Sequence, residues 1–211
     1  MDLVTGLNSL GTRADAWRFI SGFAAAWNLP LAAGTADLDT AETRLGVTLP
    51  AAVREAYAYG LYSPEQLEYD ADAKILVFRA ADQGVALYGV SLADNAEPDP
   101  PVFMHESLED KAEESWTPFM QRFSLACVDM VLWDTVEAGP LSDGRDEEDT
   151  ESFPELTPVP FPNYPGDYAA QWYVGEDVIL RHYPSWVAIA ARTQEALDAF
   201  REAHGGDWVN E

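Results

Sequence analysis

One segment constrains the fold more than any other, because its residues specify a helix, a turn and a second helix. It runs from Asp39 to Gly60. We expect Asp39 to cap the first helix, with Glu42 three positions later as its capping-box partner. Gly46 is suited to end that helix, Pro50 to open the next, and Gly60 to end it. The segment therefore predicts two short helices joined by a tight turn.

Apolar residues bracket this turn: Leu45, Val47 and Leu49. We expect their side chains to share one buried corner between the two helices. The segment offers no nucleophile, no set of metal ligands and no glycine-rich phosphate loop. It therefore predicts a scaffold, and a function that need not involve chemistry.

The same segment resembles the opening of the SUKH superfamily, which includes the yeast cell-wall-assembly regulators and many bacterial immunity proteins. The matching residues are Glu42, Leu45, Gly46, Leu49, Pro50, Tyr57 and Gly60. Later stretches are similar to that family in the same order: Gln83–Val90 as its central strand, Asp99–Val102 after it, then Trp116, Phe119, Phe123 and Ser124. The resemblance spans about Asp39 to Trp133, and it implies an α+β fold and a protein partner.

The chain departs from the family pattern at two places. A helical extension precedes the matching part, at residues 1–35, and an acidic loop or insertion follows it, at residues 137–165. We expect the whole chain, residues 1–211, to form a single SUKH-like domain, since its length and its 47% of hydrophobic residues allow one sizeable core.

The single cysteine, Cys127, excludes a framework of intrachain disulfides and is typical of a reducing cytoplasm. It lies among apolar residues with helical spacing, which favours a small core residue over a reactive thiol. The chain has no apolar run long enough to span a bilayer, and its first residues do not resemble a signal peptide. We therefore expect a cytoplasmic protein that does not insert into membranes.

The charge of the chain limits the classes of partner that it can bind. It carries 37 acidic against 12 basic residues, a net charge of −25. Such a charge repels nucleic-acid phosphates and attracts cationic proteins from a distance. Adaptation to high internal salt is an alternative explanation that one sequence cannot separate from a binding role. The acids are concentrated in residues 94–114 and 143–155, which favours a patch over a diffuse coat.

Hydrophobic periodicity places the remaining elements. An amphipathic helix is predicted at Arg13–Trp27, a second one after Ser115 as far as about Trp133, and a last one after Thr193. Strands are predicted at 74–80, 85–92, 168–174, 177–182 and 186–191, while 137–165 shows no periodicity and is predicted to be a loop. Helices first and strands without regular βαβ alternation predict an α+β fold with a largely antiparallel sheet.

Motifs for catalysis or cofactor binding are not found. His105, His182 and His204 are scattered without metal-ligand spacing, and the acidic run lacks the pattern of a calcium loop. The chain has no phosphate-binding glycine motif, and neither Ser124 nor Cys127 has a base that the sequence identifies. We expect no enzyme, no cofactor and no metal site.

Candidate protein-binding residues come from the acidic loops and from the aromatic residues of the last strands. Tyrosine and tryptophan are enriched in interface hot spots, although the same aromatic residues could instead all pack under the helices. The candidates are Asp94, Glu97, Asp99, Asp146, Glu147, Glu148, Asp149, Trp172 and Trp186.

Three functions follow as hypotheses. The first is an immunity protein that neutralises a toxin, such as a nuclease, by masking a basic active surface. The second is a regulatory or scaffolding protein of the cell-wall-assembly-regulator type. The third is a small hydrolase or ligand-binding protein, which would require a pocket with convergent polar groups.

Overall fold

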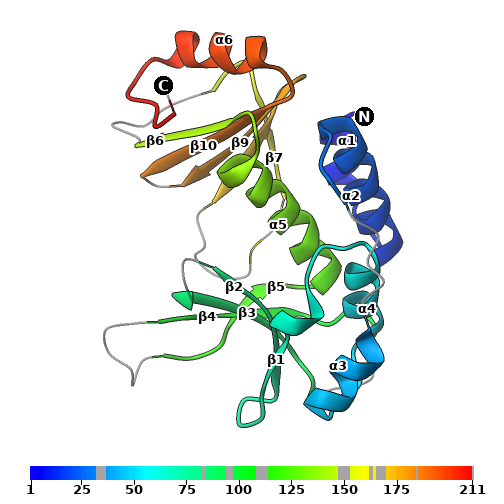
Figure 1. The fold of residues 1–211 in the computed structure, drawn as a ribbon. Helices are drawn as coiled ribbons and strands as arrows, with labels where there is room; N and C mark the ends of the chain where they lie inside the picture. The colour runs from blue at the N-terminus through cyan, green and yellow to red at the C-terminus, as the bar shows by residue number, and fades with distance from the viewer. Residues whose placement is uncertain are drawn as a thin grey trace. The chain divides into compact units, whose positions relative to one another are not determined.

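The computed structural model describes residues 1–31, 37–81, 84–93, 97–107, 114–146, 153–161, 164, 170–183 and 185–210. In these residues the chain forms six α-helices and two five-stranded sheets (Figure 1). The α+β class and the antiparallel pairing are as predicted, but the strands form two sheets instead of one. The chain divides into two compact units, residues 29–127 with 164–166, and residues 1–28, 128–163 and 167–211. Its organisation as a single domain stays a prediction.

The unit of residues 29–127 begins with helices and continues as a meander of neighbouring strands. Its sheet has the strand order β1-β2-β3-β4-β5, and every pairing is antiparallel. The elements are α3 (Leu38–Leu45), α4 (Ala51–Ala58), the 3₁₀ helix η1 (Pro64–Gln66), β1 (Glu68–Asp70), β2 (Ile75–Ala81), β3 (Ala86–Ser91), β4 (Val102–Glu106) and β5 (Thr117–Met120).

The helix corner forms as predicted, with a different cap. Asp37, not Asp39, caps α3 by accepting a hydrogen bond from the backbone N–H of Thr40. Glu42 is therefore free of the capping box and accepts a hydrogen bond from the N–H of Leu49, at 2.7 Å. Gly46 ends α3 in the left-handed conformation, with φ of 69°, where a residue without a side chain is favoured. The corner is thus closed by a carboxylate; of the apolar residues expected to share it, Leu49 is buried, whereas Leu45 and Val47 are half-buried.

The core of this unit is aromatic. Phe78 of β2 packs against Tyr62 and Phe123, with ring centroids 5.3 and 4.8 Å away, and those two rings also contact each other at 6.4 Å. Cys127 is fully buried beside them, and the hydroxyl of Tyr62 lies 3.9 Å from its sulfur. Burial raises the pKa of the Cys127 thiol, which keeps it protonated. Its position agrees with a core residue.

The helix predicted from Ser115 to about Trp133 is wrong in its first part. Residues Thr117–Met120 form β5 at the edge of the sheet, where Pro118 is tolerated because no ladder hydrogen bond is needed on the outer side. The helix, α5, runs instead over Phe123–Ala138. Its start is fixed by Asp99, which accepts hydrogen bonds from both the N–H and the hydroxyl of Ser124.

The other unit contains the second sheet, in the order β6-β10-β9-β8-β7, also antiparallel throughout. Its elements are α1 (Leu3–Asn8), α2 (Arg13–Trp27), β6 (Ser142–Asp146), β7 (Thr157–Val159), β8 (Gln171–Val174), β9 (Val178–Tyr183), β10 (Trp186–Ala191) and α6 (Gln194–His204). The prediction that 137–165 is a structureless loop is therefore wrong in part, since this range supplies both edge strands, β6 and β7.

Helices cover both faces of this second sheet. In Figure 1, α6 lies along one face, and the C-terminal part of α5 lies on the other. The α6 side holds a continuous apolar core: Phe153, Leu156, Val178, Leu180, Val187, Ile189, Ala191, Leu197, Phe200 and Trp208. On the α5 side, Trp172 of β8 donates a hydrogen bond to Asp129 of α5 at 2.9 Å.

The N-terminal helices belong to the same unit. The bounds of α2 are as predicted, and Thr12 and Asp15 form a reciprocal capping box at its start. The aromatic stripe of this helix is buried, and Phe23 stacks on both Phe19 and Trp27. The short helix α1 precedes it and was not predicted.

Candidate functional site

The first acidic loop contains one carboxylate with a structural role. Asp99 holds the start of α5 and lies 3.7 Å from the guanidinium of Arg122. Glu97, two residues earlier, is exposed, and Asp94 lies outside the described residues. Of the two candidates that are described, Asp99 stabilises the fold, and Glu97 has its side chain exposed at the surface.

The second acidic group begins at the end of an edge strand. Asp146 is exposed at the last position of β6, directly opposite Trp186, the first residue of β10. Residues directly opposite in an antiparallel pair point to the same face of the sheet. Asp146 and Trp186 are therefore side by side on one surface. Glu147, Glu148 and Asp149 lie outside the described residues.

Trp172 belongs to the core. It is 1% exposed, and its indole is bonded to Asp129, which is also fully buried. The guanidinium of buried Arg181 lies 4.1 Å from the ring centroid of Trp133 and 5.5 Å from that of Trp172. This cluster fixes α5 on the sheet, so Trp172 has no surface with which to contact a partner.

Trp186 is half-buried and lines a hollow of about 280 Å³. The hollow lies between the end of α5, strands β6 and β10, and the last residues of the chain. Its lining residues are Val136, Glu137, Ser142, Asp143, Gly144, Trp186, Ala188, Val209 and Asn210. Its wall thus combines the indole of Trp186 with aliphatic side chains and with Glu137.

The indole of Trp186 lies across the backbone of Gly144. A Cβ atom at Gly144 would stand only 2.4 Å from Cζ2 of the indole and 3.2 Å from Nε1. No real Cβ contact is that short, so glycine is needed here for space. The absence of a side chain at Gly144 therefore makes room for the indole that lines the hollow.

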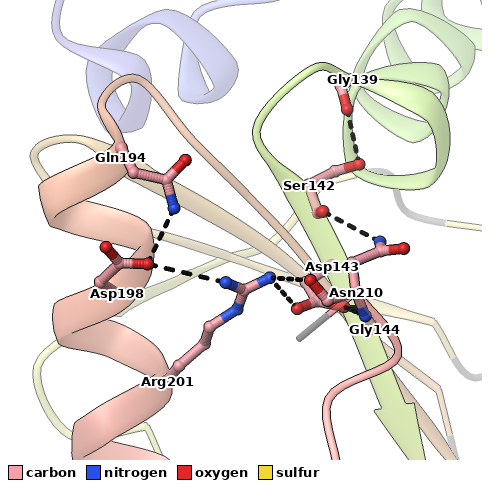
Figure 2. Close-up of polar contacts among 8 residues, drawn as sticks. All are labelled: Gly139, Ser142, Asp143, Gly144, Gln194, Asp198, Arg201 and Asn210. Carbon is pink, nitrogen blue, oxygen red and sulfur yellow. Dashed lines mark hydrogen bonds and ion pairs between the residues drawn. The ribbon is translucent and has the colours of Figure 1, made fainter.

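A buried carboxylate organises the side of the hollow formed by the chain end (Figure 2). Asp143 is 3% exposed and forms an ion pair with Arg201 of α6. Its other oxygen accepts hydrogen bonds from the backbone N–H of Gly144, at 2.8 Å, and of Asn210, at 3.0 Å. Asp143 thus joins β6, α6 and the C-terminal segment.

The C-terminal segment is held by further contacts to β6. The N–H of Val209 donates to the carbonyl of Gly144 at 3.0 Å, and the amide of Asn210 donates to the carbonyl of Ser142 at 3.3 Å. Trp208 is buried, with the guanidinium of Arg145 5.0 Å from its ring centroid. These contacts leave the side chain of Val209 66% exposed at the mouth of the hollow.

Sequence reasoning found Trp186 and Asp146 but missed the residues that build their surroundings: Glu137, Asp143, Arg201, Val209 and Asn210. Strand β6 could not be recognised in the sequence, because its residues include no apolar side chain that could show a period of two. Two hints were present. Arg145 is a lone cation in an acidic run, and Trp208 is an isolated aromatic residue after the glycine pair that ends α6.

A second hollow, of about 500 Å³, lies at the helix corner in the other unit. Its lining residues are Glu42, Thr43, Gly46, Val47, Thr48, Tyr69 and Leu92. The carboxylate of Glu42 is engaged by the N–H of Leu49 and by Arg54, which is 2.8 Å away. The carboxylate of Glu42 therefore stabilises the helix corner.

Within the described ranges, no group of three or more histidine, cysteine or carboxylate side chains is placed to hold a metal ion. His105 lies 3.9 Å from Glu114, and its ring is tilted against that of Trp116, with the centroids 5.3 Å apart, while His204 contacts Glu155. In the same ranges, no helix has both the length and the apolar character needed to cross a membrane.

Comparison of the chain with protein-family models, with curated proteins and with solved structures found no match.

Proposed function

We propose that this chain is a protein-binding module without catalytic activity, an immunity protein that neutralises a bacterial toxin by masking a basic active surface. The toxin would be a protein such as a nuclease, whose substrate groove is cationic. An acidic inhibitor speeds the encounter with such a groove and then blocks it by charge complementarity.

The observation that carries the proposal is the pairing of Asp146 with Trp186. They lie far apart in the sequence, and β6 and β10 bring them to directly opposite positions on the same sheet face. An aromatic ring flanked by carboxylates is typical of an interface anchor, because the ring supplies contact area and the charges select the partner. A chain with a net charge of −25 favours a cationic partner.

The resemblance to the SUKH superfamily supports the same proposal. The matching stretch, from about Asp39 to Trp133, falls almost entirely within the unit of residues 29–127. That unit has two helices, then a meander of five strands, then the start of another helix. A compact unit with this element order is what a family module would form.

The proposal is tested with the protein encoded next to this chain. The purified pair is mixed over a series of sodium chloride concentrations, and binding is measured by calorimetry together with the partner's toxic activity. We expect tight binding at low salt that weakens as salt rises, and loss of toxicity on binding. Binding that does not respond to salt, or a complex that keeps full toxic activity, would contradict the proposal.

A further inference from the structure

We propose that the outer face of the sheet β1-β2-β3-β4-β5 is a second docking surface, which receives an apolar patch of the cationic partner bordered by lysine or arginine. This outer face is the side of the sheet away from Phe78 and α5, and its apolar residues are Ile75, Val77, Leu87, Gly89, Phe103 and Trp116. The inference rests on the proposed function and adds to it a contact surface in the unit of residues 29–127.

The residues of β3 show that this sheet has two apolar faces. Val90 is buried on the inner face, directly opposite Leu76 and Val102, which are also buried. Successive side chains of a strand point to opposite faces, so Leu87 and Gly89 lie on the outer face. An antiparallel sheet with one face in water typically carries polar residues on that face. A half-buried leucine at position 87 departs from this pattern.

The strand register extends the apolar character across the outer face. Directly opposite residues point to the same side, so Val77, Gly89 and Phe103 form one row across β2, β3 and β4. The pairing of β3 with β4 continues one residue earlier, because the carbonyl of Val85 accepts a hydrogen bond from the N–H of Ser107 at 2.7 Å. Val85 therefore follows the alternation of β3 onto the outer face, where 52% of it is exposed. This face thus leaves apolar surface accessible to a partner.

Trp116 supplies an aromatic anchor on the outer face. A Cβ atom at Gly89 would stand 2.2 Å from Cγ2 of Ile75 and 3.3 Å from Cη2 of Trp116. The absence of a side chain at Gly89 therefore makes room for the indole over β3. The ring also packs against His105, with the centroids 5.3 Å apart, and it stays half-buried. Tryptophan is among the residues most enriched in binding hot spots, so the accessible part of this ring suits a protein contact.

Carboxylates border the apolar row along β1. Glu68 is directly opposite Val77, and Asp70 is directly opposite Ile75, so both acids lie on the outer face. Glu68 is exposed, and Asp70 accepts hydrogen bonds from two backbone N–H groups, which leave its negative charge in place. Among the described strand residues of this face there is no lysine or arginine. The border therefore favours a patch with cations at its edge.

A second copy of this chain fits the outer face less well than a cationic protein does. Two copies would bring together the same acidic border and two net charges of −25. Like charges that meet across an interface are unfavourable. A partner with lysine or arginine beside an apolar patch complements both the row and its border.

The first experiment uses the full chain and an amphipathic helical peptide of leucine and lysine as the probe. A peptide of serine and lysine with the same charge is its control. The indole N–H signals are followed by nuclear magnetic resonance, and the Trp116 signal is assigned by its absence from Trp116→Phe. We expect this signal to shift with the leucine peptide and to stay in place with the serine peptide, because docking requires the apolar contact. Equal shifts with both peptides, or no shift at Trp116, would overturn the inference.

Paired variants locate the contact. Val85→Asn should weaken the leucine peptide's affinity by about fivefold, the size expected for the loss of a partly buried valine, whereas Val85→Ile should keep it. Glu68→Gln should weaken it by about threefold, as expected for an exposed charge pair, whereas Glu202→Gln should leave it unchanged. Urea unfolding confirms that each variant is folded. If each variant weakens the peptide no more than its control does, the contact is not at this face and the inference fails.

The neighbouring protein separates this inference from the proposed function. If it binds the chain and loses its toxicity, but Val85→Asn and Glu68→Gln leave its affinity unchanged, the docking surface is wrong and the proposed function stands. If the leucine peptide docks at Trp116 but the neighbouring protein does not bind, the proposed function fails and the docking surface stands. If the chain alone forms a dimer that Val85→Asn dissociates, a second copy covers this face and the inference is overturned.

Discussion

At the scale of single residues, Asp143 joins three segments of the fold: β6, α6 and the C-terminal segment. Replacing it by asparagine keeps the shape of the side chain but leaves Arg201 without its buried counter-charge. Breaking a buried pair in this way costs about 3 kcal/mol. We expect Asp143→Asn to lower the free energy of unfolding, measured in urea, by about that amount. Asp177→Asn is the control, since its pair with Arg192 is exposed and worth about 0–1 kcal/mol. Equal losses would contradict the role given to Asp143.

The contact of Glu155 with His204 predicts a pH dependence. Burial alone would raise the pKa of Glu155, but its hydrogen bonds, including the one with His204, more than offset this and lower the pKa. A carboxyl with a lowered folded-state pKa stabilises the protein above its unfolded pKa, and this contribution is lost as pH falls through the folded pKa. We expect Glu155→Gln to reduce stability at pH 7, and the difference from the wild type to disappear as the pH falls through the lowered folded-state pKa of Glu155. Glu202→Gln, on the exposed side of α6, controls for the loss of one negative charge.

At the scale of elements, the helix corner depends on the carboxylate of Glu42, which was predicted from the sequence to form a capping box with Asp39. Glu42 joins the N–H of Leu49 to Arg54, whereas Asp39 contacts Arg54 from an exposed position, with 85% of its side chain accessible. We expect Glu42→Ala to lower the free energy of unfolding by about 1.5–3 kcal/mol, the range for hydrogen bonds to charged groups. Asp39→Ala, which removes the other partner of Arg54, should cost less than about 1 kcal/mol. Thermal or urea unfolding distinguishes the two, and the reverse order would contradict this account.

Elements with strong local signals could be predicted from the sequence. The helix α2 has a capping box and an apolar stripe, and α6 has Thr193 at its start and a glycine pair at its end. The strand β6 could not be predicted, because Ser142–Asp146 contains no apolar residue and is held in the sheet by tertiary contacts. The start of α5 was misplaced for a similar reason, since its capping group, Asp99, comes from a distant loop.

The candidate site could be predicted only in part, because its geometry depends on strand register. Asp146 and Trp186 were identified by residue type, but their opposition follows from the pairing of β6 with β10. Asp99 and Trp172 were identified by the same criteria, and the structure gives both of them partners inside the fold. Composition alone does not tell a carboxylate or an indole at the surface from one that holds the core.

At the scale of the whole molecule, the net charge of −25 opposes folding, because the compact state brings like charges closer together. Some carboxylates, such as Asp99 and Asp143, are compensated by donors within the fold, but the chain holds 37 acidic residues against 12 basic ones, so most of the negative charge has no cationic residue to balance it. Salt screens this repulsion, with a Debye length of ~10 Å at 0.1 M and ~3 Å at 1 M. Added salt should therefore stabilise the folded state, whereas it should weaken a complex with a cationic partner.

These opposite responses separate a binding role from adaptation to high salt. We expect the unfolding temperature to rise with sodium chloride over the range in which binding of the neighbouring protein weakens. In a partner interface the effect is local, so Glu137→Gln and Asp146→Asn should flatten the salt dependence of binding while barely changing that of the unfolding temperature. In a salt-adapted protein every exposed acid contributes alike, so those two variants would behave as Glu202→Gln does in both measurements. In that case the acidic surface around Trp186 would not support a binding role, because its charges would contribute only to the chain's tolerance of salt.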